Sequence, residues 1–97
     1  MKDFLFYNEL YDLYKNLLTE KQRLYFEDYY FNNLSLSEMS ENYNISRNAI
    51  SKQLSAIRNH LRDYEDKLKL NNKKTILTSL INKIENEKLA DQIRDVL

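Results

Sequence analysis

Apolar side chains recur along the chain at the three- and four-residue steps of an α-helix. This pattern predicts five helices, over about residues 3–16, 19–32, 35–43, 46–68 and 75–96. In the long fourth helix the apolar positions are Ile50, Leu54, Ile57, Leu61, Tyr64 and Leu68. Alternating β-branched runs and Asn-Gly or Asp-Gly turns are absent from the sequence. We therefore expect an all-α bundle that ends in an amphipathic C-terminal helix.

The shorter helices have equally regular apolar faces. We place Phe4, Tyr7, Leu10, Tyr11 and Tyr14 on the first. The second uses Leu24, Tyr25 and Tyr29, with Phe26 as a further candidate, and the third uses Leu36, Met39 and Tyr43. A chain of this length can bury one modest core, and we expect most of the tyrosines to pack in the core of the first half.

Polar residues indicate where the helices begin and end. Thr19 with Gln22, and Ser35 with Glu38, have the spacing of a capping box, and Ser46 suits the start of the fourth helix. The chain contains no glycine and no proline, so asparagine is the next best residue for a left-handed helix end. The expected stops are Asn32-Asn33, Asn42/Asn44 and Asn71-Asn72.

Length and composition bound the class of protein. A chain of 97 residues with 42% hydrophobic and 31% charged residues is typical of one globular domain. We divide it into a helix-turn-helix domain at 1–70 and a C-terminal helix at 71–97. Neither a membrane span nor a signal peptide is expected, because no run of about 18 apolar residues exists. We expect a cytoplasmic protein.

Residues 35–61 have the pattern of a helix-turn-helix, with Ile45 as the apolar residue of the turn. The polar face of the second helix carries side chains that reach phosphates and base edges in nucleic acids. These candidate binding residues are Arg47, Asn48, Ser51, Lys52, Ser55, Arg58, Asn59 and Arg62. A polar outer face is also common in helical bundles that bind nothing.

The charges are distributed unevenly although the formal net charge is zero. Residues 1–43 hold four basic and eight acidic side chains, whereas residues 44–62 hold four basic and none that is acidic. This acid-free run favours nucleic-acid binding by the fourth helix.

The C-terminal segment carries an apolar stripe that a lone terminal helix would leave in water. Its members are Leu77, Ile81, Ile84, Leu89, Ile93 and Val96. A two-fold homodimer would bury this stripe. Packing back across Ile57, Leu61 and Tyr64 would bury it within one chain, and the two arrangements are compatible.

Residues 17–68 resemble region 4 of bacterial sigma factors, and more closely the YlxM family of small helix-turn-helix proteins encoded beside signal recognition particle genes. The shared features are a tyrosine-rich first half, the "LTEKQR" entry, "SLSE" at Ser35–Glu38 and "DYEDKL" at Asp63–Leu68. The resemblance implies a sigma-type helix-turn-helix and a role in the signal recognition particle pathway. Its implied partners are the particle's RNA and its GTPase.

Two residues depart from the general helix-turn-helix pattern. Ser40 replaces the usual alanine, and we expect its hydroxyl to bond to a carbonyl one turn earlier. Asn44 replaces the usual turn glycine and tolerates the left-handed conformation.

Other chemistry finds little support. The single histidine, His60, has no cysteine or carboxylate cluster around it in the sequence, so we expect no metal site, no cofactor and no enzyme. Tyr7, Tyr11 and Tyr30 could stack on bases, but core packing is favoured.

Three functions remain open. The first is a sequence-specific DNA-binding regulator that uses Arg47, Asn48, Ser51 and Lys52. The second is a signal recognition particle accessory protein that touches its RNA or its GTPase. The third is a protein-interaction module with an inherited helix-turn-helix.

Overall fold

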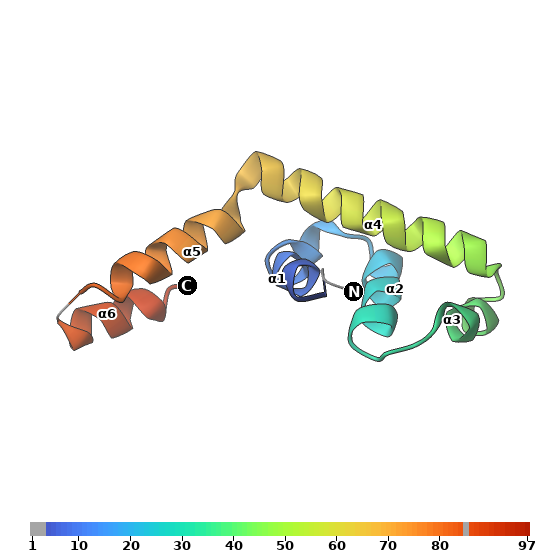
Figure 1. The fold of residues 1–97 in the computed structure, drawn as a ribbon, viewed down its shortest axis with the longest axis horizontal. Coiled ribbons are helices and arrows are strands. Elements are labelled where there is room, and N and C mark those ends of the chain that lie inside the picture. Colours follow the sequence, from blue (N-terminus) through green and yellow to red (C-terminus); the bar gives the residue numbers. More distant parts are fainter. Residues whose placement is uncertain (1–3, 85) are drawn as a thin grey trace.

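The computed structural model describes residues 4–84 and 86–97, and every regular element in these ranges is helical. The elements are α1 (Phe4–Tyr14), a 3₁₀ turn η1 (Lys15–Leu17), α2 (Glu20–Tyr30), α3 (Leu36–Tyr43), α4 (Arg47–Leu68), α5 (Leu70–Ile81) and α6 (Glu87–Arg94). Helices α1, α2 and α3 pack against α4, whereas α5 and α6 extend beyond its C-terminal end (Figure 1). The all-α prediction is confirmed for the described residues.

One aromatic-rich core joins α1, α2, α3 and α4. The Phe26 ring stacks between Tyr11 and Tyr30, with centroid separations of 4.2 Å on both sides. The other buried members are Tyr7, Leu10, Tyr14, Leu18, Tyr25, Met39, Ile50, Leu54, Ile57 and Leu61. Phe26 therefore lies at the centre of the core, whereas Leu24, which we predicted on this face, is exposed. The reason is that α2 turns the side bearing Tyr25, Phe26 and Tyr30 inward, which leaves Leu24 outside it.

The local helix signals are confirmed. Thr19 with Gln22, and Ser35 with Glu38, form complete capping boxes, and the Ser46 hydroxyl accepts the Ala49 amide at 3.0 Å. These contacts satisfy amide groups that have no partner inside the helix.

The first helix ends earlier than predicted. Asp3, its expected start, lies outside the described residues, and α1 ends at Tyr14, so that Asn16 belongs to the 3₁₀ turn η1. The Arg23 guanidinium closes this turn by donating to the carbonyl oxygens of Lys15 at 3.3 Å and Leu18 at 3.0 Å. A side chain from the next helix therefore shapes this end.

The predicted stop at Asn71-Asn72 is wrong, because both residues lie inside α5. The break falls at Lys69, which has φ 54°. The Tyr14 hydroxyl accepts the Leu70 amide at 3.0 Å, and the Glu65 carboxylate accepts the amides of Asn71 and Asn72 at 3.0 and 3.2 Å. A side chain of α4 and one of α1 thus cap α5, so the helix can begin five residues before Thr75.

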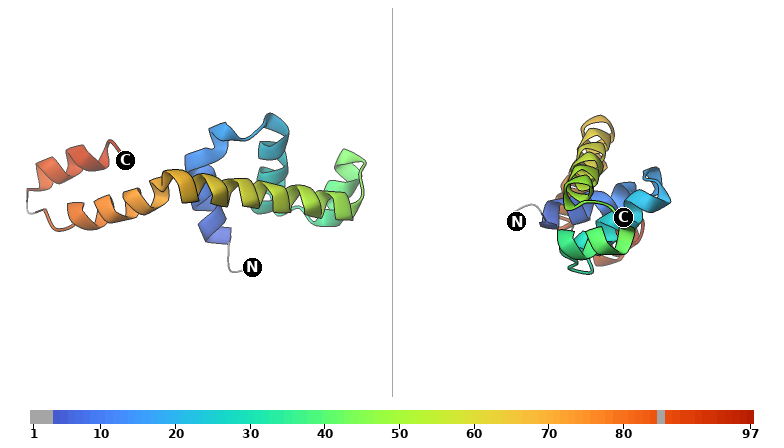
Figure 2. Two further views of the ribbon diagram at one scale, coloured as in Figure 1. Left: turned by 90° about the horizontal axis from the view of Figure 1, so that it is seen from above. Right: turned by 90° about the vertical axis from the view of Figure 1, so that its right-hand side faces the viewer.

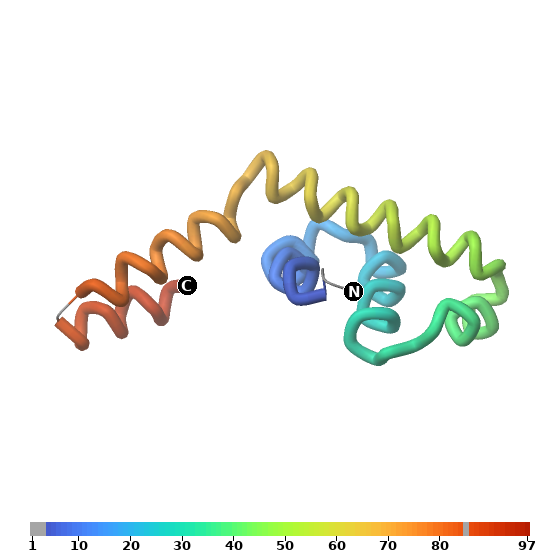
Figure 3. The backbone as a smooth tube through the Cα atoms, in the orientation of Figure 1, coloured from blue at the N-terminus to red at the C-terminus, as the bar shows by residue number. Residues whose placement is uncertain are grey.

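The single C-terminal helix predicted from the sequence is two helices. The chain reverses direction between α5 and α6 (Figure 3). Asn86 begins α6, where its side chain accepts the Leu89 amide at 3.1 Å. Ile81 and Ala90 are the buried residues of this pair. We call residues 70–84 and 86–97, which include α5 and α6, the arm, and α1–α4 the helix-turn-helix domain.

The arm gives the molecule its length. The principal extents are 55 × 25 × 24 Å, and the views in Figure 2 show α5 continuing away from the domain at the end of α4. Helix α5 packs against α1 and α6. The exposed face of α4 at the other end of the molecule is therefore clear of the arm.

Candidate nucleic-acid interface

The helix-turn-helix consists of α3, a three-residue turn and the start of α4. Asn44 ends α3 in the left-handed conformation, with φ 55° and ψ 44°, as the sequence predicted. Its amide and that of Ile45 donate to the Ser40 carbonyl, the second at 3.2 Å. The Ser40 hydroxyl does not bond one turn back as we expected. It donates forward to the Ile45 carbonyl, because the left-handed residue folds that carbonyl over the end of α3.

Burial divides α4 into two faces. Ile50, Leu54, Ile57 and Leu61 are buried against the domain core, as predicted from their spacing. The predicted binding residues share the remaining polar side of the helix. Arg47, Asn48, Lys52, Ser55, Asn59 and Arg62 are exposed, whereas Ser51 and Arg58 are half-buried.

The tip of this face, at the start of α4, is largely free of contacts. The Arg47 guanidinium lies 3.4 Å from the Ser37 hydroxyl of α3. Neither Asn48 nor Lys52 makes a side-chain hydrogen bond or ion pair within the described ranges. These side chains can therefore reorient toward a ligand at small cost.

Further along α4, two arginines are held by tyrosines of other helices. Arg58 Nη1 donates to the Tyr30 hydroxyl of α2 at 3.2 Å. Arg62 Nη1 donates to the Tyr7 hydroxyl of α1 at 3.0 Å, and its Cζ lies 6.0 Å from that ring's centroid. Sequence reasoning placed both arginines on the binding face but missed the role of Tyr7 and Tyr30.

The tyrosines pack in the core as favoured, and Tyr7, Tyr11 and Tyr30 are all buried. Burial raises the pKa of Tyr30, while the Arg58 hydrogen bond opposes that rise. Burial, followed by the hydrogen bond to Asp28, raises the pKa of Tyr43 to about 12. Tyr30 and Tyr43 are consequently neutral at physiological pH, and neither offsets the positive charge of α4.

The residues predicted to form a dimer occupy different environments in the arm. Ile81 is buried within the arm, whereas Ile84 and Ile93 are half-buried. Leu77, Leu89 and Val96 are exposed. The stripe is thus divided between a small internal contact and an uncovered apolar surface.

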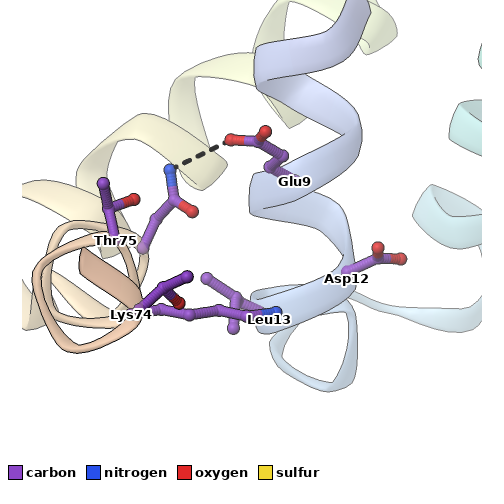
Figure 4. Close-up of a pocket in the computed structure, with 7 residues that line it drawn as sticks. Glu9, Asp12, Leu13, Lys74 and Thr75 are labelled. Carbon is purple, nitrogen blue, oxygen red and sulfur yellow. Dashed lines mark hydrogen bonds between the residues drawn. The ribbon is translucent and has the colours of Figure 1, made fainter. Parts of the chain in front are cut away.

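A cleft of about 280 Å³ lies between α1 and α5, away from the predicted binding face. Glu9, Asp12 and Leu13 line one side and Lys74 and Thr75 the other (Figure 4). The Asn71 amide crosses it to donate to Glu9 at 3.3 Å. This hydrogen bond across the cleft therefore connects the arm to the domain.

Other site types find no support in the described part of the chain. No group of three or more His, Cys, Asp or Glu side chains there could hold a metal ion. His60 is exposed, with its ring centroid 6.4 Å from that of Tyr64. No helix in residues 4–84 and 86–97 is long and apolar enough to cross a membrane.

Comparison with known proteins gives one consistent result. A family model described as "Putative helix-turn-helix protein, YlxM / p13 like" (UPF0122) matches residues 1–96. A UPF0122 protein of Mycoplasma capricolum is 44% identical over 85 residues, which cover 88% of this chain and 75% of the relative. A UPF0122 protein of Caldanaerobacter subterraneus is 46% identical over 82 residues, which cover 84% of this chain and 70% of the relative. One from Shouchella clausii is 39% identical over 85 residues, or 88% and 78%.

Proposed function

This chain belongs to the UPF0122 family of YlxM/p13-like helix-turn-helix proteins, and we propose that it is a non-enzymatic accessory or regulatory protein that binds nucleic acid through the polar face of α4. One observation carries the proposal. Arg47, Lys52, Arg58 and Arg62 follow that face over about 22 Å, and none forms an ion pair within the described residues. Cations without acidic partners attract a polyanion.

The proposed target is the RNA of the signal recognition particle, on the strength of the YlxM resemblance. The deep, narrow major groove of an A-form stem would not admit α4, so the protein would follow the phosphates and recognise shape. The acidic first half would repel the same RNA. The particle's GTPase is a second proposed partner, which would contact that acidic half through a basic surface.

The alternative is a DNA-binding regulator. Arg47, Asn48, Ser51 and Lys52 stand at the start of α4, where recognition helices contact base edges. This part of the face is the least constrained by contacts within the chain. The alternative therefore uses the same surface and differs in reading bases instead of shape.

Titrating the protein against the particle RNA and against duplex DNA of equal length separates these functions. We expect RNA binding whose log binding constant falls with log salt concentration at a slope near −3. The reason is that the four cations of α4 release about three counterions from the RNA. Tighter, sequence-dependent binding to one DNA site would favour the regulator. Absence of binding to either nucleic acid at low salt would leave the protein-interaction module.

The charge-reversing double variant Arg47→Glu with Lys52→Glu should abolish nucleic-acid binding. Its free energy of unfolding should change by under about 0.5 kcal/mol, because both side chains are exposed. Lys73→Glu with Lys83→Glu in the arm changes the net charge equally and is the matched control. Equal loss of binding in both variants would show that net charge matters and the face does not.

We further propose that the exposed apolar side chains of the arm join two copies in a homodimer. Leu77 and Leu80 of α5 and Leu89 of α6 are between 42% and 52% exposed. Leu77 and Leu80 are three residues apart and lie on the same side of α5. A two-fold axis through the arms would bury these side chains and leave both helix-turn-helix domains free.

A further inference from the structure

Arg58 and Arg62 are fixed in place without being neutralised. Each guanidinium donates to a tyrosine hydroxyl through Nη1 and to a second neutral side chain through Nη2. The neutral partners are Tyr30 with Ser55 for Arg58, and Tyr7 with Asn59 for Arg62. These contacts restrict the side chains and remove none of their charge.

Among the described residues, no carboxylate forms an ion pair with either arginine, not even the exposed Asp66 one turn after Arg62, and three others bond elsewhere. Glu65 caps α5, Glu27 accepts the Tyr11 hydroxyl, and Asp63 pairs with Lys67 at 3.0 Å. An arginine with a purely structural role would gain more from such a carboxylate than from a phenol. Each guanidinium has five N–H donors, of which the protein uses two, so three remain for an anion.

We propose that Arg58 and Arg62 bind two neighbouring phosphates of one nucleic-acid strand, and that Tyr30 and Tyr7 are the positioning residues of this pair. The inference rests on the proposed function. It names the ligand of Arg58 and Arg62, which we call the rear pair because they lie further along α4 than Arg47 and Lys52. The two arginines are one helical turn apart, about 6 Å along the axis, and share a face of α4. Phosphodiesters at that spacing occur in any strand, so the pair recognises backbone and not sequence.

The proposal divides the face of α4 into two parts. Arg47 and Lys52 at the tip can adjust to a target. Arg58 and Arg62 are already oriented, so they lose less side-chain entropy on binding. The rear pair would then fix the register of the strand while the tip contacts its bases or groove.

The test is a titration of a short RNA duplex with Tyr7→Phe, Tyr30→Phe and the double variant. Each phenylalanine keeps the ring and removes the hydroxyl, and we expect binding about two- to tenfold weaker per tyrosine. Both charges remain, so most of the salt slope should persist. Arg58→Gln with Arg62→Gln should instead lower the slope by about two. Tyr11→Phe is the control. The Tyr11 hydroxyl bonds to Glu27 and not to an arginine, so this variant should bind as the wild type does.

A second readout separates this inference from the proposed function. The Nε–H resonances of Arg58 and Arg62 are followed while tripolyphosphate is added, and we expect both to shift in the wild type and less in the double tyrosine variant. Shifts without duplex binding would keep the phosphate pair and reject the proposed function. If the tyrosine and arginine variants bind the duplex as tightly as the wild type does, the proposed phosphate-binding pair is wrong. If the wild type responds neither to the duplex nor to tripolyphosphate, the phosphate-binding pair and the proposed function are both wrong.

Discussion

The helix-turn-helix domain and the arm bury their apolar residues to very different extents. The domain contains a continuous core from Tyr7 to Leu61. Among the described residues of the arm, Ile81 and Ala90 are the buried apolar side chains, and Val96 is 85% exposed. Isolated helices shorter than about 12–15 residues are marginal in water, and α5 and α6 have 12 and 8. The domain can therefore be stable by its own packing, whereas the arm depends on what it touches.

The largest expected effect is alkaline unfolding of the domain. The pKa values of Tyr11, Tyr14, Tyr30 and Tyr43 are all raised, chiefly by burial. A tyrosine whose pKa is raised by folding stabilises the folded state in full below its unfolded pKa, near 10. This stabilisation is lost as pH rises through the folded pKa, which is about 12 for Tyr43.

This effect should be measured by circular dichroism between pH 9 and pH 12. We expect helicity to fall steeply above about pH 10. Residues 70–97 contain no tyrosine, so the arm has no such group of its own. A molecule that keeps its domain helicity at pH 12 would contradict the role of the buried phenols.

Core truncation should distinguish the two regions next. Phe26→Ala should lower the free energy of unfolding by about 3–5 kcal/mol, because it empties the centre of the aromatic stack. Ile81→Ala should leave the domain's urea midpoint unchanged and increase hydrogen exchange only in the arm. Equal shifts of the global midpoint would mean that domain and arm unfold as one unit.

The junction between the regions gives an intermediate effect. Glu65→Gln keeps one acceptor oxygen but removes the charge that binds the first amides of α5, a loss of about 1.5–3 kcal/mol. Hydrogen exchange should rise in residues 70–81 and stay low in α4. Asp66→Asn, at an exposed neighbouring acid, is the control. Unchanged protection of α5 in Glu65→Gln would show that the cap is unimportant.

The smallest effect on stability belongs to the exposed arm surface. Leu77→Ser with Leu80→Ser should change the unfolding free energy by less than about 1 kcal/mol in total. Sedimentation equilibrium should nevertheless show a fall from the dimer to the 11.8 kDa monomer mass. A wild-type protein that already sediments at 11.8 kDa across micromolar concentrations would rule out the dimer.

Signals within one helical turn were readable from the sequence. The capping boxes of Thr19 and Ser35 join residues three apart, and the buried stripe of α4 repeats at helical spacing. Asn44 adopts the conformation for which asparagine is suited. The Asn86 cap is equally local, and attention to it would have divided the C-terminal helix correctly.

Contacts between distant residues were not readable. Tyr14 accepts the amide of Leu70, and Arg62 donates to Tyr7, across 56 and 55 residues of chain. No local periodicity encodes such pairs, because they depend on how α1 crosses α4. For the same reason, polar spacing predicted which side of α4 is left uncovered by the core, but not which of its arginines would be held in place.

The length of the molecule also determines how it moves through a solvent. Its radius of gyration is 16.9 Å, whereas a compact chain of this size would have about 12.5 Å. An elongated particle experiences more friction than a sphere of equal mass, so even the monomer should elute early from a sizing column. Its rotational diffusion should be anisotropic, with slower end-over-end tumbling than spinning about the long axis. Amides in α4 and α5, which run near that axis, should therefore relax differently from those of α1, which crosses beneath α4 (Figure 2).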